Sequence, residues 1–108
     1  MVKYYETITL TVGAGATAET TWAPETDVVL HSITATERGG ASLDNVHLQL
    51  LIANTPIMRP SIPMSKLGDY SNRALPININ VAKGETITFK VTNNTGSSVT
   101  VDITLRCD

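Results

Sequence analysis

Residues 75–105 read LPININVAKGETITFKVTNNTGSSVTVDITL, and this stretch contains three strand patterns separated by two turn signals. Apolar and polar side chains alternate in three runs, Leu75 to Val81, Ile87 to Val91 and Val99 to Leu105. Lys83-Gly84 and Asn93-Asn94-Thr95-Gly96 separate these runs, and such residues are typical of turns. Alternation with a period of two gives each strand one buried and one solvated face, which indicates an antiparallel sandwich or barrel.

The same alternation recurs in the first half of the chain. It covers four segments, Tyr4 to Val12, Thr17 to Ala23, Val28 to Thr36 and Asn45 to Ala53. The glycine-rich stretch Gly13-Ala14-Gly15-Ala16 is interpreted as a hairpin turn, and Arg38-Gly39-Gly40 as a second turn. No long segment carries an apolar stripe of helical period, so no helix is expected. We therefore predict an all-β, jelly-roll-like, two-sheet antiparallel sandwich of about seven or eight strands.

Length and charge restrict the class of protein. The chain has 108 residues, which predicts a single β-sandwich domain over residues 1–108. Its net charge is −2 and its pI is near 5.6, and the low basic content argues against binding nucleic acid through phosphates. No apolar run approaches the roughly 18 residues that span a bilayer, so no membrane partner is expected. Residues 1–6 lack the apolar region of a secretory signal peptide, so secretion by that route is not expected.

Residues with catalytic or metal-binding potential are few and scattered. Cys107 is the only cysteine, which excludes an internal disulfide, and it stands one residue from the end of the sequence. His31 and His47 have no spacing typical of a metal site. No nucleophile motif or phosphate-binding loop is present. We predict that the protein is not an enzyme and holds no metal and no cofactor.

Two local motifs have alternative interpretations. Asn93-Asn94-Thr95 has the form of a glycosylation sequon, and we interpret it as a turn because no signal peptide accompanies it. Trp22 is the only tryptophan. It is either a plug at the end of the sandwich or at a subunit contact, or an exposed platform for a ligand.

The segment 54–73 departs from the strand pattern. It contains three prolines, which exclude a central strand, and it is long for a connection within a compact domain. It also carries the apolar residues Ile57, Met58, Ile62, Met64, Leu67 and Tyr70. Either the loop caps the core, or part of it packs on another subunit. For the second case we predict an interface made by Ile57, Met58, Ile62, Met64 and Tyr70, with Tyr4 and Tyr5 as a second contact region.

A family resemblance adds to this interpretation. Residues 75–96, LPININVAKGETITFKVTNNTG, combine an alternating strand, a G-E-T-I turn and a strand that ends in N-N-T-G. This hairpin resembles small jelly-roll and related sandwich proteins of virus and phage particles. The resemblance implies a capsid decoration, turret or spike-base subunit, whose partners are other capsid or virion proteins. It also implies localisation to the virion, with assembly in the host cytoplasm, and transfers no catalytic residue.

These observations predict a non-enzymatic virion structural protein. Outer strand faces that are rich in threonine and poor in charge lose little when they are covered by a neighbour, which favours a homo-oligomer docked on a larger shell. The alternative is a carbohydrate- or receptor-binding sandwich module. That alternative requires a glycan site with exposed aromatic side chains, at Trp22 or Tyr70.

Overall fold

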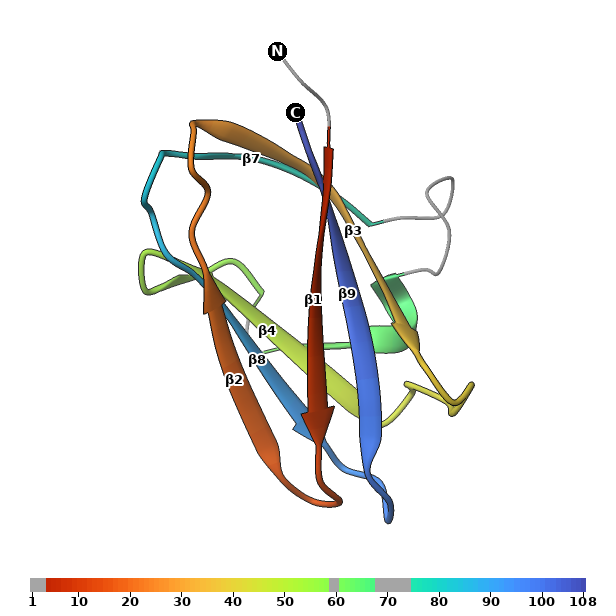
Figure 1. Cartoon of the computed structure of the whole chain (residues 1–108). Coiled ribbons are helices and arrows are strands. Elements are labelled where there is room, and N and C mark those ends of the chain that lie inside the picture. The colour runs from red at the N-terminus through yellow and green to blue at the C-terminus, as the bar shows by residue number, and fades with distance from the viewer. Residues whose placement is uncertain (1–3, 59–60, 68–74) are drawn as a thin grey trace.

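The computed structural model describes residues 4–58, 61–67 and 75–108 (Figure 1). These residues form nine strands and one short 3-10 helix. Their bounds are β1 (Tyr4–Val12), β2 (Thr17–Trp22), β3 (Val28–Glu37), β4 (Val46–Ile52), β5 (Thr55–Pro56), β6 (Ile62–Pro63), η1 (Met64–Leu67), β7 (Leu75–Val81), β8 (Ile87–Asn93) and β9 (Val99–Cys107). The seven longer strands coincide with the seven segments in which apolar and polar side chains alternate.

The strands form two antiparallel sheets that pack face to face (Figure 1). One sheet has the order β1-β9-β3-β7, and the other has the order β2-β8-β4-β5, with β6 also paired to β4. Apart from the short β5 and β6, each strand belongs to the sheet opposite that of the strand before it. This alternation between sheets is the arrangement of a jelly roll, which confirms the predicted fold class.

The connection between β1 and β2 corrects one expectation. We interpreted Gly13-Ala14-Gly15-Ala16 as a hairpin turn, but it joins strands of different sheets. The Ala16 N–H donates to the Gly13 carbonyl over 3.0 Å, and Gly15 has a φ of 68°, a conformation that favours glycine. The sequence could not reveal this crossing between sheets. A hairpin within one sheet and a connection between two sheets both need a turn and strands with an apolar face.

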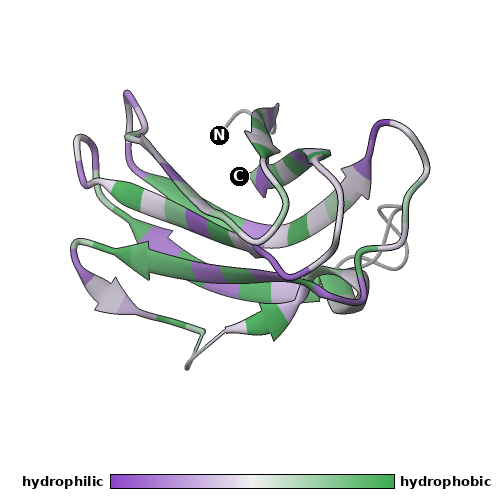
Figure 2. Ribbon diagram, turned by 90° about the horizontal axis from the view of Figure 1, so that it is seen from below, coloured by the Kyte–Doolittle hydropathy of each residue, from purple (hydrophilic) through white to green (hydrophobic). Residues whose placement is uncertain are grey.

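The core lies between the two sheets. Its largest fully buried side chains come from the inner faces of β3, β4, β8 and β9, and include Leu30, Ile33, Leu48, Leu50, Ile87, Phe89, Ile103 and Leu105. Hydrophobic and hydrophilic residues alternate along these strands (Figure 2). The central strands are therefore filled on one face and polar on the other, as alternation predicts.

The segment after β4 also contributes to the core, which corrects part of the predicted interface. Met58 is only 6% exposed, and Met64 and Leu67 are fully buried. Met58 and Met64 therefore cannot act as surface anchors in this structure, because the sandwich already encloses them. Leu67 ends the short helix η1, which contacts β3 and β4. The described part of this segment caps the sandwich, as the first of our two interpretations holds.

Candidate functional site

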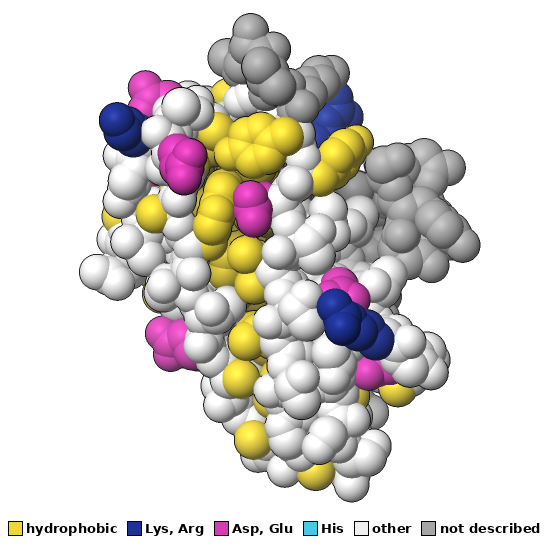
Figure 3. Space-filling model, viewed as in Figure 1, with side chains coloured by type: hydrophobic (Ala, Val, Ile, Leu, Met, Phe, Trp, Pro, Cys, Tyr) yellow, Lys and Arg dark blue, Asp and Glu magenta, His cyan; other side chains and the backbone are white. Residues whose placement is uncertain are grey.

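Among the described residues, the edge strands β1 and β2 leave one side of the sandwich without a covering strand, and we call this uncovered apolar side the β1–β2 opening. β1 ends the order of one sheet and β2 ends the order of the other, and the two strands contact each other near their connecting turn (Figure 1). Five side chains along this opening pack against the core but remain partly exposed, namely Tyr4, Ile8, Leu10, Ala18 and Trp22. We refer to these five residues as the β1–β2 stripe. Figure 3 shows a band of hydrophobic side chains between the two strands.

The stripe follows from alternation in an edge strand. Along β1 the even-numbered residues face inward, and their odd-numbered neighbours are exposed. Val12, beside the turn, is fully buried, whereas Ile8 and Leu10 are only half-buried. Because β1 and β2 have a neighbouring strand on one side only, their inner side chains receive less cover than those of β8 and β9.

Glu6 interrupts the apolar side of β1. It shares the inner face with Tyr4 and Ile8 and is half-buried like them. Partial burial raises the pKa of Tyr4, and Cys107 and the carboxylates of Glu6 and Glu25 raise it further. Both carboxylates therefore act electrostatically at this end of the stripe. In Figure 3 acidic side chains lie within and beside the hydrophobic band.

Tyr4 and Cys107 face each other across the pairing of β1 and β9. Burial raises the pKa of the Cys107 thiol, which a hydrogen bond from the Tyr4 hydroxyl lowers in part. A thiol whose pKa is raised stays protonated at neutral pH, and the thiol form is a weak nucleophile. Tyr4 is thus a half-buried contact between β1 and β9, while its neighbour Tyr5 is 61% exposed on the outer face.

The outer face beside the opening is a hydroxyl-rich ladder. Thr7 pairs with Thr104 over 3.2 Å, and Thr11 pairs with Thr100 over 3.1 Å. Between them Thr9 donates to Asp102 over 2.6 Å. These side chains satisfy one another, so a partner that covers this face displaces little bound water from charged groups.

Two carboxylates fix the β3–β4 connection next to this ladder. Asp102 accepts a hydrogen bond from Arg38 over 3.0 Å, and the hydrogen bonds from Arg38 and Thr9 lower the pKa of Asp102.

Glu37 accepts backbone N–H groups of Thr100 at 2.9 Å, Ala41 at 3.0 Å and Gly39 at 2.6 Å. The backbone hydrogen bonds from Thr100 and Ala41 are the main reason why the pKa of Glu37 is lowered.

Asn93 holds the two turns at the end of the sandwich. It is fully buried, and its amide donates to the carbonyls of Val12 at 3.1 Å, Gly13 at 3.2 Å and Ser97 at 2.8 Å. Its Oδ1 accepts the Thr95 N–H at 3.0 Å. The interpretation of Asn93-Asn94-Thr95 as a turn fits this structure, because the sequon nitrogen is buried and fully used.

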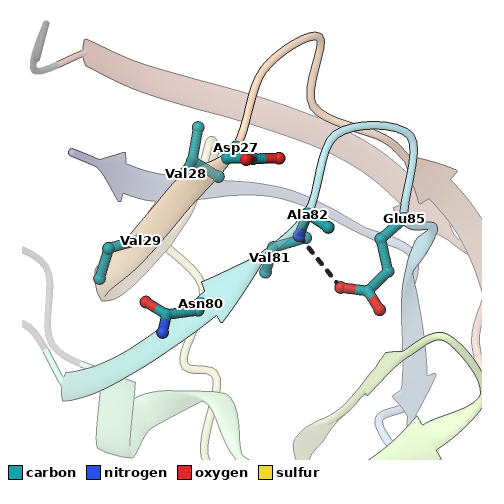
Figure 4. Close-up of a pocket in the computed structure, with 7 residues that line it drawn as sticks. All are labelled: Asp27, Val28, Val29, Asn80, Val81, Ala82 and Glu85. Atoms are coloured by element: carbon teal, nitrogen blue, oxygen red, sulfur yellow. Dashed lines mark hydrogen bonds between the residues drawn. The ribbon is translucent and has the colours of Figure 1, made fainter.

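A cavity of about 410 Å³ lies where β3 begins and β7 ends, lined by Asp27, Val28, Val29, Asn80, Val81, Ala82 and Glu85 (Figure 4). Both of its carboxylates have structural partners. Asp27 accepts the Lys83 N–H at 2.8 Å, and Glu85 accepts the Ala82 N–H at 3.2 Å. None of these lining residues is aromatic, so the cavity lacks the stacking platform expected of a glycan site.

The remaining residues predicted for a contact or a ligand platform are Ile57, Ile62, Trp22 and Tyr70. Ile57 and Ile62 are half-buried at the β4 edge, where Ile62 pairs with Leu48. Trp22 packs against the core at the end of β2 and remains partly exposed. Tyr70 lies outside the described residues.

Of the β1–β2 stripe, the sequence predicts only Tyr4 as a contact residue and Trp22 as a plug, a subunit contact or a platform. The alternation over residues 4–12 places Ile8 and Leu10 on one strand face with Val12, but it does not show that part of this face is uncovered. The missing information was the strand order, because only an edge position leaves inner residues partly uncovered. An inward-facing carboxylate in an otherwise apolar strand face was the available signal.

The described part of the chain shows neither a metal-binding cluster nor a membrane-spanning helix. It holds no group of three or more His, Cys, Asp or Glu side chains that could bind a metal ion. No helix within residues 4–58, 61–67 or 75–108 is long and apolar enough to cross a membrane. His31 lies where the register of β3 shifts, and its Nδ1 has no hydrogen-bond partner.

Comparisons with known proteins give little guidance. No family model and no curated protein matches the chain. Among solved structures, the chain is similar to the Drosophila NLP-core, described in a study of pentamer formation and histone binding. The two share 17% sequence identity, the match covers 94% of this chain and 97% of the other, and the TM-score is 0.44. These values are too low to transfer a function or an assembly state.

Proposed function

We propose that the protein is a non-enzymatic structural subunit of a virus or phage particle, of the capsid-decoration or spike-base type. In this role it associates with copies of itself and docks on a larger shell. The observation that carries the proposal is the partly exposed apolar surface on both open sides of the sandwich. One side carries the β1–β2 stripe, and the other carries Ile57, Ile62 and the inner residues of the edge strand β7.

The β4 edge supports contacts between copies. Ile57 directly follows β5 and Ile62 lies in β6, and both of these short strands pair with β4. Both isoleucines remain partly exposed, whereas Met58 and Met64 are buried. Partly exposed apolar side chains suit such a contact, because the centre of a protein interface is more apolar than the rest of the surface. Ile57 and Ile62 therefore remain in the proposed interface, and Met58 and Met64 do not belong to it.

The jelly-roll arrangement supports the particle setting only as a resemblance. The block at residues 75–96, which resembles virus and phage sandwich proteins, forms β7 and β8 in opposite sheets, so it is not the hairpin that the sequence indicated. Jelly rolls are common in viral capsids, but they also occur in lectins and other proteins. The particle assignment therefore depends on an assembly test.

The alternative function, a glycan- or receptor-binding module, makes a separate prediction. It requires Trp22 or Tyr70 to form a stacking platform, and Trp22 packs partly against the core. A saturable shift of tryptophan fluorescence on addition of a glycan would favour this alternative, because Trp22 is the only tryptophan. No shift across a glycan panel would leave the structural role as the better account.

The test of self-association is to replace Ile62 by aspartate. We expect Ile62→Asp to lower the oligomer to a monomer in sedimentation velocity while its circular dichroism stays that of a β-sandwich, because a charge at a contact is costly to bury. Thr55→Asp is the matched control, since Thr55 is exposed on the neighbouring strand β5. Ile57→Asp provides a second variant if Ile62→Asp does not fold. Unchanged oligomers in a folded Ile62→Asp or Ile57→Asp variant would contradict the proposed contact.

A further inference from the structure

We infer that the β1–β2 opening is a docking site for an extended segment of another protein, in which a Lys or Arg stands between apolar residues. The segment would add as a strand to the free edge of β1. This inference rests on the proposed function, because it specifies the kind of segment by which a larger shell would hold the subunit.

The backbone edge of β1 that faces away from β9 is free to pair with an added strand. β1 runs from Tyr4 to Val12 and pairs with β9 along its whole length, and it ends the strand order of its sheet. On its other side no described residue continues the sheet. An edge strand of this kind presents a row of N–H and C=O groups, and extended peptides bind to such edges by main-chain hydrogen bonds.

The inner side chains of β1 and β2 determine which residues an added strand needs. An added strand would project every second side chain into the opening, between β1 on one side and β2 on the other. Opposite Ile8 and Leu10 these side chains would contact apolar surface, and Trp22 lies across the gap at the end of β2. The partner therefore needs apolar residues at those positions.

The negative charge of Glu6 determines which charged residue the added strand needs. Glu6 lies on the inner face between Tyr4 and Ile8, and the carboxylate of Glu25 also acts on Tyr4. Covering Glu6 with an apolar side chain would remove water from its carboxylate without a replacement partner, which is unfavourable. A Lys or Arg opposite Glu6 supplies that partner, because opposite charges facing each other across a strand pair are favourable.

The described strands of a second copy do not fit this pattern. Basic residues within them are limited to Lys90 of β8 and Arg106 of β9. Both strands already have neighbours on each side, and Lys90 lies between threonines on its own face. Two β1 strands paired about Ile8 would place Glu6 opposite Leu10, with no cation. The described strands of a second copy therefore do not supply this segment, and we assign the occupant to a different protein.

The test uses a synthetic peptide as the probe. The peptide acetyl-SVTITKTVS-amide places Lys opposite Glu6 and apolar residues opposite Leu10, Ile8 and Tyr4 in an antiparallel pair. Since Trp22 is the only tryptophan of the protein and lies at the opening, its fluorescence reports binding. We expect a saturable change with this peptide, and an affinity at least about tenfold lower for acetyl-SVTITETVS-amide, whose Glu meets Glu6.

Variants of Glu6 then test the charge pair. Glu6→Gln should weaken binding of the lysine peptide by roughly two- to fivefold, in the range of a cross-strand ion pair. Glu6→Lys should reverse the preference, so that the glutamate peptide becomes the tighter ligand. Glu19→Gln is the matched control, because Glu19 is exposed on the outer face of β2, and it should leave both affinities unchanged. Circular dichroism establishes that each variant is folded.

Two results would overturn the inference. One is the absence of a saturable change with the lysine peptide on the wild-type protein, and the other is equal binding of both peptides. Neither result depends on self-association, which is measured separately. A chain that binds the lysine peptide but stays monomeric would keep this docking site and contradict the self-associating subunit.

Discussion

At the scale of single residues, Asn93 links parts of the chain that are distant in sequence. Its amide group joins the end of β1 to the turn before β9, and it is the one buried polar residue among those that the structure describes. Buried polar groups that are fully hydrogen-bonded help to specify a single arrangement of the chain. Asn93 therefore fixes how the two turns meet.

Replacing Asn93 tests this role. Asn93→Ala should lower the free energy of unfolding by about 2–4 kcal/mol, because it removes the donor of the buried Val12 carbonyl and of the part-buried carbonyls of Gly13 and Ser97. Asn94→Ala is the control, since Asn94 is exposed, and a surface change of this kind costs about 0.5 kcal/mol or less. Urea denaturation measures both. Similar losses for the two variants would contradict the assigned role of Asn93.

Acid should weaken the fold through Glu37 and Asp102. Hydrogen bonds lower both pKa values in the folded state, below their ordinary values of 4.5 and 3.8. The unfolded chain therefore binds protons at a higher pH than the folded chain. Their stabilisation is present above the ordinary values and is lost as pH falls through the folded-state values. We expect Tm to decrease as pH is lowered from about 5 towards 3.

The Asp102→Asn variant isolates one of these groups. It should have a lower Tm at neutral pH and a weaker dependence of Tm on acid pH, because the group no longer titrates. Thermal unfolding followed by circular dichroism over a pH series gives both quantities. A variant with the same acid dependence as the wild type would show that Asp102 is not a source of the effect.

At the scale of elements, the segment after β4 shows why apolar content alone does not locate a surface. The segment has three prolines, and its apolar residues are not regularly spaced. Without a regular alternation, the sequence does not show which side chains face the core and which face outward. Met58, Met64 and Leu67 face the core, whereas Ile57 and Ile62 remain partly exposed. A sequence can show that such a segment is apolar, but only packing shows which side chains are enclosed.

Truncating Met64 tests the capping role of this segment. Met64→Ala should destabilise the fold by about 2–5 kcal/mol, as expected for a buried methionine. Ser65→Ala should change stability by about 0.5 kcal/mol or less, because Ser65 is exposed in the same short helix η1. Chemical denaturation compares the two variants. A loss of stability near zero for Met64→Ala would indicate that this residue is not part of the core.

The strands themselves were accessible to prediction. Alternation located all seven longer strands and the inner faces of β4, β8 and β9. The connections were less accessible, since Gly13-Ala14-Gly15-Ala16 crosses between sheets instead of closing a hairpin. A tight turn is compatible with a hairpin and with a crossing between sheets. Which of the two forms depends on which strand faces pack together.

At the scale of the whole molecule, the strand order creates the candidate surfaces. β1 and β2 end their sheets on one side, and β7 and β5 end them on the other. Alternation predicted the inner-facing residues of β1 and β7, but not that these strands lie at an edge, and it predicted no strand at β5. The partly exposed positions of Ile8, Leu10 and Glu6 follow from the edge, so the site could not be derived from periodicity.

The central claim is that the protein is a structural subunit that associates with its own copies. Light scattering on a sizing column, at two protein concentrations, measures its molar mass directly. We expect a defined closed oligomer, such as a trimer or pentamer, whose mass is a whole multiple of 11.6 kDa at both concentrations. A monomer at both concentrations would contradict self-association.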